Sequence, residues 1–133
     1  MPALIKALGG WGDWLSDNVR CAAAWALGAI GDPQAVPPLI QALGDNSWDV
    51  RWAAAKALGA IGDPQAVPAL IQALGGSDPA VRCAAAEALG KLGDPQAIPA
   101  LIQRLWDWSE DVCRAAQQAI QQIETKQSQT KQP

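Results

Sequence analysis

The fold is decided by the sequence GDPQAVPPLIQALG at residues 31–44, which recurs as GDPQAVPALIQALG at 62–75 and as GDPQAIPALIQRLW at 93–106. The segments between these copies also align: they read VRCAAAWALGAI (19–30), VRWAAAKALGAI (50–61), VRCAAAEALGKL (81–92) and, more diverged, VCRAAQQAIQQI (112–123). The first valine of each segment keeps a 31-residue step along the chain. Internal repetition with a period of a few tens of residues is typical of solenoids and propellers. The repeat therefore organises the 133-residue chain.

Each repeat carries the start signals of two helices. An aspartate followed by proline predicts the first helix, because aspartate accepts unpaired amide protons and proline has no amide proton to leave unpaired. These aspartates are Asp32, Asp63 and Asp94. A second proline inside each first helix is expected to bend or restart it. The second helices are expected to begin at the cap residues Ser16, Ser47, Asp78 and Ser109, and the glycines near their ends, Gly28, Gly59 and Gly90, to allow close packing.

Neither helix of a repeat can bury its apolar stripe alone, so neighbouring repeats must stack. We predict an all-α fold, an α-α superhelix (solenoid) of about four two-helix repeats in residues 1–124. The units are placed at about 2–30, 31–61, 62–92 and 93–124. The segment TKQSQTKQP at 125–133 is polar and has no apolar residues, which predicts a disordered tail.

The combination of GDPQAVPALIQAL with the VR-x-AAA-x-ALG segments resembles the short HEAT-like repeats of the phycobilisome-lyase type. It is also similar to the artificial alphaRep scaffolds built from such repeats. The resemblance covers roughly residues 2–123. It implies a fold rather than an activity, because the family includes bilin lyases, pigment-degradation factors, scaffolds and engineered binders. HEAT-family hydroxylases use His-Glu metal motifs, and the absence of histidine excludes that branch.

The charge, the apolar runs and the cysteine spacing argue against several kinds of partner, membrane insertion and metal binding. The net charge of −3 and the lack of clustered Lys and Arg argue against nucleic acid and anionic membranes. The apolar start of the chain is too short for a signal peptide, and no apolar run approaches the length of a membrane span. The three cysteines have no metal-site spacing. We therefore expect a cytoplasmic protein with reduced thiols and no bound metal.

The positions that vary between near-identical repeats predict a binding face on the second helices. Trp48, Trp52 and Lys56 are four residues apart, so they share one side of a helix. Charged residues on that side show that it is not the core, and the HEAT resemblance implies that it is the concave surface. Tryptophan is enriched among residues that dominate binding energy. The candidate binding residues here are Trp25, Trp48, Trp52, Cys21, Cys83, Lys56, Glu87 and Arg114.

The alternative interpretation is that these tryptophans only fill gaps over alanine-rich surface. The turns carry four more tryptophans: Trp11 and Trp14 in the first turn, and Trp106 and Trp108 in the last. These either bind a partner or cap the ends of the solenoid core. The arginines that follow the repeat valine, Arg20, Arg51 and Arg82, resemble the ladder that links HEAT repeats through acidic neighbours such as Asp49.

The residue types in this chain give little support for a catalytic function. The chain has no histidine and no tyrosine, which removes the commonest general base and most catalytic triads. No catalytic residue is predicted. The leading hypothesis is a non-catalytic scaffold that binds a protein or peptide on the variable face, or a second copy of itself as a homodimer.

Two further interpretations stay open. The first is a tetrapyrrole (bilin)-handling protein resembling a bilin lyase subunit or a pigment-release factor, in which tryptophans stack on the ligand and Cys21 or Cys83 contacts it. Against it, the chain has no histidine or tyrosine to hold the pyrroles. The second is an engineered or consensus-like repeat scaffold, which the near-identity of the copies favours.

Overall fold

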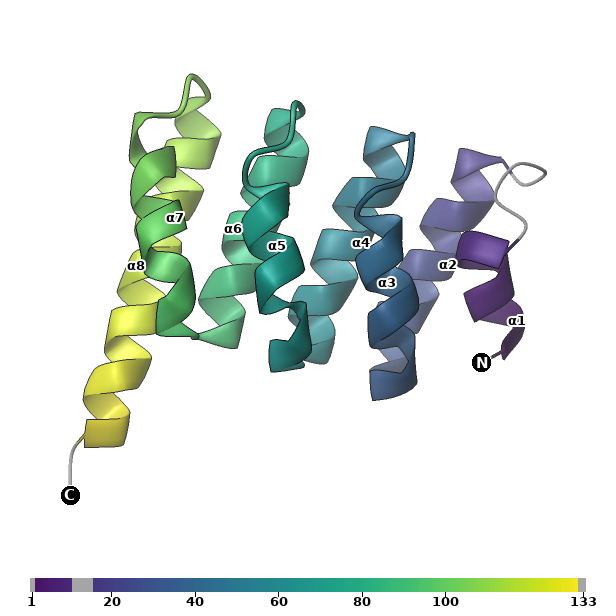
Figure 1. Ribbon diagram of the computed structural model, residues 1–133, viewed down its shortest axis with the longest axis horizontal. Coiled ribbons are helices and arrows are strands. Elements are labelled where there is room, and N and C mark those ends of the chain that lie inside the picture. The colour runs from purple at the N-terminus through teal and green to yellow at the C-terminus, as the bar shows by residue number, and fades with distance from the viewer. Residues whose placement is uncertain (1, 11–15, 132–133) are drawn as a thin grey trace.

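The protein is a two-layer helical solenoid, described here by a computed structural model for residues 2–10 and 16–131 (Figure 1). The second helices of the repeats stack side by side in one layer: α2 (Asp17–Ile30), α4 (Trp48–Ile61), α6 (Pro79–Leu92) and α8 (Glu110–Lys131). The shorter first helices form the other layer: α1 (Pro2–Ile5) with the π-helical turn η1 (Lys6–Gly10), α3 (Val36–Ala42), α5 (Val67–Ala73) and α7 (Ile98–Gln103). The predicted all-α solenoid is confirmed.

Each complete first helix is interrupted near its start, as its internal proline predicted. Asp32 caps a 3-10 turn, η2 (Pro33–Ala35), and accepts the Gln34 amide at 2.9 Å. The α-helix restarts at Val36, with a proline in its opening turn, where no hydrogen bond is lost. The same construction recurs at η3 (Pro64–Ala66) and η4 (Pro95–Ala97). The turn η5 (Arg104–Trp106) follows α7.

Glycine ends the second helices in a left-handed conformation. Gly31, Gly62 and Gly93 have φ angles of 76°, 78° and 71°. Their amides donate to the carbonyls of Leu27, Leu58 and Leu89, which closes each helix before the next aspartate cap. The register of the repeat is thus set by local backbone chemistry.

The core between the layers is built from alanine, leucine and valine. Leu39, Leu70 and Leu101 of the first helices are fully buried beneath the alanine-rich second helices. The second helices approach one another at glycine: a Cβ added to Gly59 would lie 3.0 Å from the Cα atom of Ala88. The same close approach occurs between Gly28 and Ala57 and between Gly90 and Ala119, confirming the packing role predicted for these glycines.

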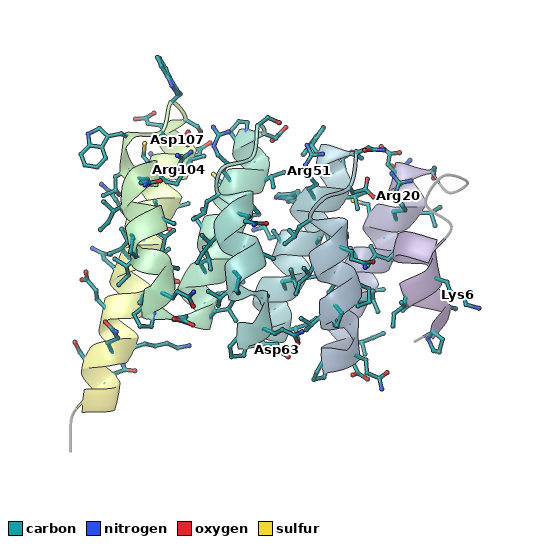
Figure 2. All side chains as sticks on the ribbon, in the orientation of Figure 1. Lys6, Arg20, Arg51, Asp63, Arg104 and Asp107 are labelled. Carbon is teal, nitrogen blue, oxygen red and sulfur yellow. The ribbon has the colours of Figure 1, made fainter. Side chains whose placement is uncertain are left out.

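Ion pairs between repeats line one edge of the solenoid (Figure 2). Arg20 donates to Asp45 through Nε and Nη2 at 2.9 and 3.0 Å, and Arg82 donates to Asp107 in the same way at 2.9 Å for both bonds. These aspartates lie in the loops that enter the following second helix. The predicted ladder therefore exists, but the expectation that it runs through Asp49 is wrong. Asp49 belongs to the helix itself, whereas the loop aspartate faces the preceding arginine.

The C-terminal segment differs from the disordered tail expected at 125–133, because α8 continues to Lys131. No glycine or proline interrupts the segment before Pro133, and glutamine and lysine favour helix. Lys126 also reaches back, with Nζ donating to the Lys91 carbonyl at 3.0 Å. In the described part of the chain, no helix combines the length and apolar character needed to cross a membrane.

Candidate functional site: a face of the second helices

The residues that vary between repeats lie together on the outer side of the second-helix layer. We call this surface the variable face and define it by two rows across α2, α4, α6 and α8. One row is Cys21, Trp52, Cys83 and Arg114, and the next is Trp25, Lys56, Glu87 and Gln118. Contacts join members of these rows on neighbouring helices, between Trp25 and Trp52 and between Lys56 and Glu87.

The aromatic end of the variable face contains an edge-to-face tryptophan pair. The rings of Trp25 and Trp52 have centroids 5.3 Å apart at an interplanar angle of 76°. Trp52 is half-buried and packs on the core, so the gap-filling interpretation describes part of its role. Trp25 remains 44% exposed, and Trp48, one turn before Trp52 on α4, is 46% exposed. The two exposed rings present apolar surface to solvent beside a fixed third ring.

The charged part of the face is formed by cross-repeat and local ion pairs. Lys56 Nζ lies 2.6 Å from Glu87 Oε2, which joins α4 to α6 as predicted. Arg114 lies 4.0 Å from Asp111 on the same helix, and both side chains are exposed. Exposed pairs of this kind contribute at most about 1 kcal/mol to the free energy of folding. A partner can therefore replace either half of such a pair at a small cost in free energy.

The cysteines on this face are held as neutral thiols. Burial raises the pKa of Cys21, as do the nearby carboxylates of Asp49, Asp17 and Asp45, and its Sγ donates to the Asp49 carbonyl at 3.2 Å. Burial also raises the pKa of Cys83, together with the acidic side chains around it, against the opposing effect of Arg82. The thiolate is the nucleophilic form of cysteine. Both thiols are therefore poor nucleophiles at neutral pH.

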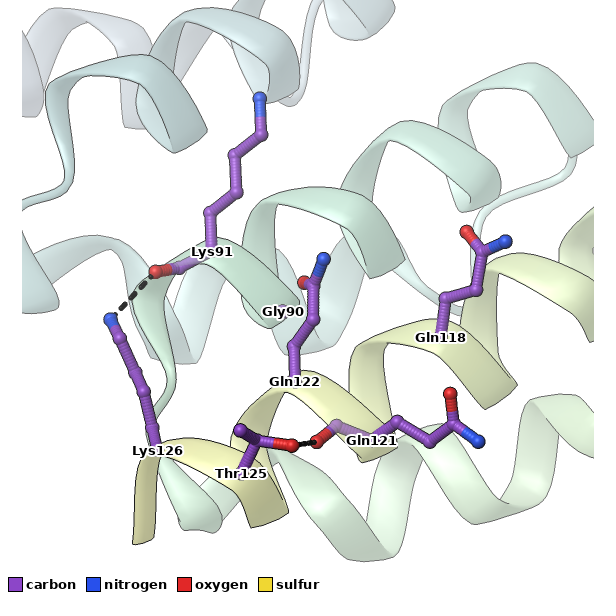
Figure 3. Close-up of a pocket in the computed structure, with 7 residues that line it drawn as sticks. All are labelled: Gly90, Lys91, Gln118, Gln121, Gln122, Thr125 and Lys126. Carbon is purple, nitrogen blue, oxygen red and sulfur yellow. Dashed lines mark hydrogen bonds between the residues drawn. The ribbon is translucent and has the colours of Figure 1, made fainter. Parts of the chain in front are cut away.

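The C-terminal end of the face is hollowed between α6 and α8. A cavity of about 510 Å³ is lined by Gly90, Lys91, Gln118, Gln121, Gln122, Thr125 and Lys126 (Figure 3). Two smaller hollows, of about 310 and 230 Å³, lie nearby, and Glu87 and Gln118 line both of them. We did not predict this cavity from sequence, because Thr125 and Lys126 were assigned to a disordered tail. A signal was present, since Gln118 and Gln122 continue the variable positions of the earlier repeats.

Trp106 and Trp108 lie in the turn between α7 and α8, outside the two rows that define the variable face. Trp106 is 79% exposed and Trp108 is 102% exposed. The interpretation that these two cap the end of the core is wrong, because a capping ring would lose its solvent exposure. Trp11 and Trp14 lie outside the described residues.

Nothing on the described part of the chain assembles a metal site. No group of three or more His, Cys, Asp or Glu side chains converges there to hold an ion. The variable face instead combines exposed aromatic rings, accessible charges of both signs and shallow hollows. Exposed aromatic rings with polar groups around them are typical of surfaces that contact another molecule.

Stacked two-helix repeats with an open face of variable residues define an α-solenoid scaffold. The sequence pattern of HEAT repeats matches this chain at residues 1–77 and 38–121. The chain belongs to the HEAT-repeat family. No protein of curated function matches it in sequence.

Solved structures of the same fold include two natural proteins and one engineered protein. Human deoxyhypusine hydroxylase aligns with a TM-score of 0.82 at 30% identity, over 99% of this chain and 46% of its own. The CpcE–CpcF complex of phycocyanin lyase from Nostoc sp. PCC7120 aligns at 0.81 and 34% identity, over 96% and 53%. The engineered protein aligns at 0.70 and 23% identity, over 91% and 61%, and shows the fold alone. The chain thus spans about half the length of the two natural proteins.

Proposed function

We propose that this HEAT-repeat chain is a non-catalytic scaffold that binds a protein or peptide on its variable face. The observation that carries the proposal is the tryptophan cluster, in which Trp25 and Trp48 stay exposed beside the half-buried Trp52. Tryptophans at a flat surface are favoured anchors because one ring buries a large apolar area with little loss of rotamer freedom. The neighbouring Lys56–Glu87 pair supplies polar contacts at the rim.

The test compares two double variants with the same change in composition. Trp25→Ala/Trp52→Ala removes the aromatic pair from the face, and Trp106→Ala/Trp108→Ala removes two exposed rings from the last turn. Partners captured from lysate of the source cell are identified by mass spectrometry, and each is then purified and titrated against all three proteins. We expect the face variant to weaken binding at least about 30-fold, corresponding to about 2 kcal/mol, and the turn variant to bind like the wild type.

Circular dichroism establishes that both variants are folded before binding is compared. Binding that survives in the face variant and is lost in the turn variant would overturn the proposal. Self-association through the face would appear in light scattering as a mass of twice 13.9 kDa that reverts to 13.9 kDa in the face variant.

A second candidate function is bilin handling, which the fold shared with a phycocyanin lyase favours. In that case Trp25 and Trp52 would stack on the pigment, and Cys21 or Cys83 would contact it. The absorption spectrum of the captured material separates the two functions. A visible band that disappears in the face variant would support the pigment, and a protein without such a band would support the scaffold.

A further inference from the structure

The ladder of ion pairs between repeats has a gap at its middle arginine. Arg20 and Arg82 each hold a loop aspartate, Asp45 and Asp107, whereas the equivalent residue in front of Arg51 is Gly76. The three positions share one backbone hydrogen bond. The amides of Asp45, Gly76 and Asp107 each donate at 3.1 Å to the carbonyl three residues earlier.

Among the described residues, Arg51 therefore forms no ion pair within 4.0 Å, although its charge still acts on the Asp45 carboxylate. Its hydrogen bond is made by Nη1, which donates to the carbonyl oxygen of Asp45 at 2.6 Å. Arg82 makes the same bond to the Gly76 carbonyl at 2.8 Å and still has Nε and Nη2 for Asp107. By this equivalence, Arg51 keeps Nε and Nη2 available on the side where the aspartate is missing.

This gap opens into a cavity of about 330 Å³ between α3, α5 and the loop that enters α6. Its lining includes the charged residues Arg51 and Asp78, together with Gly76, and apolar residues such as Ile40 and Leu43. A volume of this size lies at the lower end of the range for small-ligand sites, which combine apolar walls with a few fixed polar groups.

The two ion pairs that do form, Arg20–Asp45 and Arg82–Asp107, show how a carboxylate would be held here. In each pair, one oxygen of the aspartate also accepts a hydrogen bond from a backbone amide two residues later. The Ser47 amide donates to Asp45 and the Ser109 amide donates to Asp107, each at 2.9 Å. The equivalent amide at the gap belongs to Asp78. A guanidinium fork together with an amide is a strong, charge-assisted arrangement for a carboxylate.

We infer that this cavity binds a small aliphatic carboxylic acid, whose carboxylate replaces the missing aspartate and whose carbon chain lies against Ile40 and Leu43. The carboxylate of Asp78 also lines the cavity and opposes a second negative charge, although it is directed at the Ala80 amide at 2.8 Å. The affinity is accordingly modest. The dissociation constant for an acid of about six carbons is on the order of 1 mM.

The experiment titrates the full chain with hexanoate at constant ionic strength and follows amide chemical shifts by NMR. Hexanamide serves as the uncharged ligand. Gly76→Asp supplies the missing carboxylate within the chain, whereas Gly75→Asp adds the same charge one residue away, outside the cavity lining. We expect saturable shifts around residues 76–78 in the wild type and in Gly75→Asp, and binding at least about tenfold weaker for hexanamide and for Gly76→Asp.

A second variant, Arg51→Gln, removes the guanidinium and keeps a donor for the Asp45 carbonyl, so it provides the same comparison if Gly76→Asp were to misfold. Three results would overturn the inference. These are an absence of saturable shifts in the wild type up to about 30 mM, well above the expected constant; equal binding of hexanoate and hexanamide; and hexanoate binding that is unchanged in both Gly76→Asp and Arg51→Gln.

Discussion

At the scale of single residues, the packing of one repeat on the next depends on glycines at the points where the second helices meet. A Cβ on Gly59 would lie 3.0 Å from both the Cα and the Cβ of Ala88, which is tighter than ordinary carbon–carbon contact. Glycine is ordinarily unfavourable inside a helix by about 1 kcal/mol relative to alanine. Its presence at the same point in three second helices is explained by the distance between those helices.

Gly59→Ala is expected to lower the free energy of unfolding by about 1–3 kcal/mol, because α6 must move away from α4 despite the better helix propensity of alanine. Gly44→Ala is the matched control. It is exposed, and its added Cβ would lie 3.5 Å from the nearest atom, so its effect should stay within about 0.5 kcal/mol. Urea unfolding measures both variants. Equal effects of the two substitutions would contradict the packing explanation.

At the scale of elements, a loop aspartate ties α4 and α8 to the arginine of the preceding repeat. Asp107 is only 3% exposed. Burial alone would raise its pKa, but hydrogen bonds from Arg82 and the Ser109 amide, with the charges of Arg82 and Arg104, hold that pKa below the ordinary value of 3.8. The pKa of Asp45 is lowered in the same way by Arg20, the Ser47 amide and Arg51, against the effect of burial.

Because the folded pKa of Asp107 lies below the unfolded one, its contribution to stability is complete above pH 3.8 and is lost as the pH falls through the folded pKa. Asp107→Asn should lower the free energy of unfolding by about 2 kcal/mol at pH 7 and flatten its decline below pH 3.8. Asp49→Asn is the control: it should change the free energy of unfolding by no more than about 0.5 kcal/mol and should leave its decline below pH 3.8 as in the wild type. Urea unfolding at a series of pH values measures both, and a slope in Asp107→Asn equal to that of the wild type would refute the assignment.

The gap in the ladder predicts a stabilising substitution. Gly76→Asp should raise the free energy of unfolding by about 1 kcal/mol, since the new carboxylate meets Arg51 and the chain loses the freedom of a glycine in the unfolded state. The position has no positive φ, and the added Cβ would need only a small adjustment from the Ala73 carbonyl at 3.3 Å. Gly75→Asp should not stabilise. A destabilised Gly76→Asp would show that the loop differs from its counterparts.

At the scale of the whole molecule, α8 is the last helix of the stack that the structure describes. Ile123 is fully buried, whereas the side chains at 124–129 are exposed apart from the half-buried Gln127. The core therefore ends near Ile123, although the helix itself continues to Lys131. The part of α8 beyond Ile123 therefore contributes little to the buried core.

Truncation after Glu124 is accordingly expected to change the free energy of unfolding by less than about 1 kcal/mol. Ile123→Ala should cost about 2–4 kcal/mol, because it leaves a void against the last repeat. Thermal and urea unfolding compare the two proteins. A truncated chain as unstable as Ile123→Ala would mean that the last turns of α8 hold the stack together.

Much of the architecture could be predicted because its signals are local. Asp32 with Pro33, the glycine at the end of three of the second helices and the 31-residue step can all be recognised without knowing which helices touch. The rows of the variable face could also be predicted, since residues four apart share a helix side. The partner of Arg20 could not, because Asp45 reaches it through the path of a loop between two helices.

The sequence by itself determined the helices, their caps, the repeat and the side of the second helices that varies, because each depends on residues within one or two turns of each other. Only the tertiary structure decided that Trp52 is half-buried while Trp25 is exposed, that an open hollow lies between α6 and α8, and that Arg51 faces a glycine. These features depend on the separation and rotation of neighbouring repeats. That geometry arises from the packing of small residues such as Gly59 and Ala88 across the interface between repeats. The repeat in the sequence does not by itself give the separation and rotation at each interface.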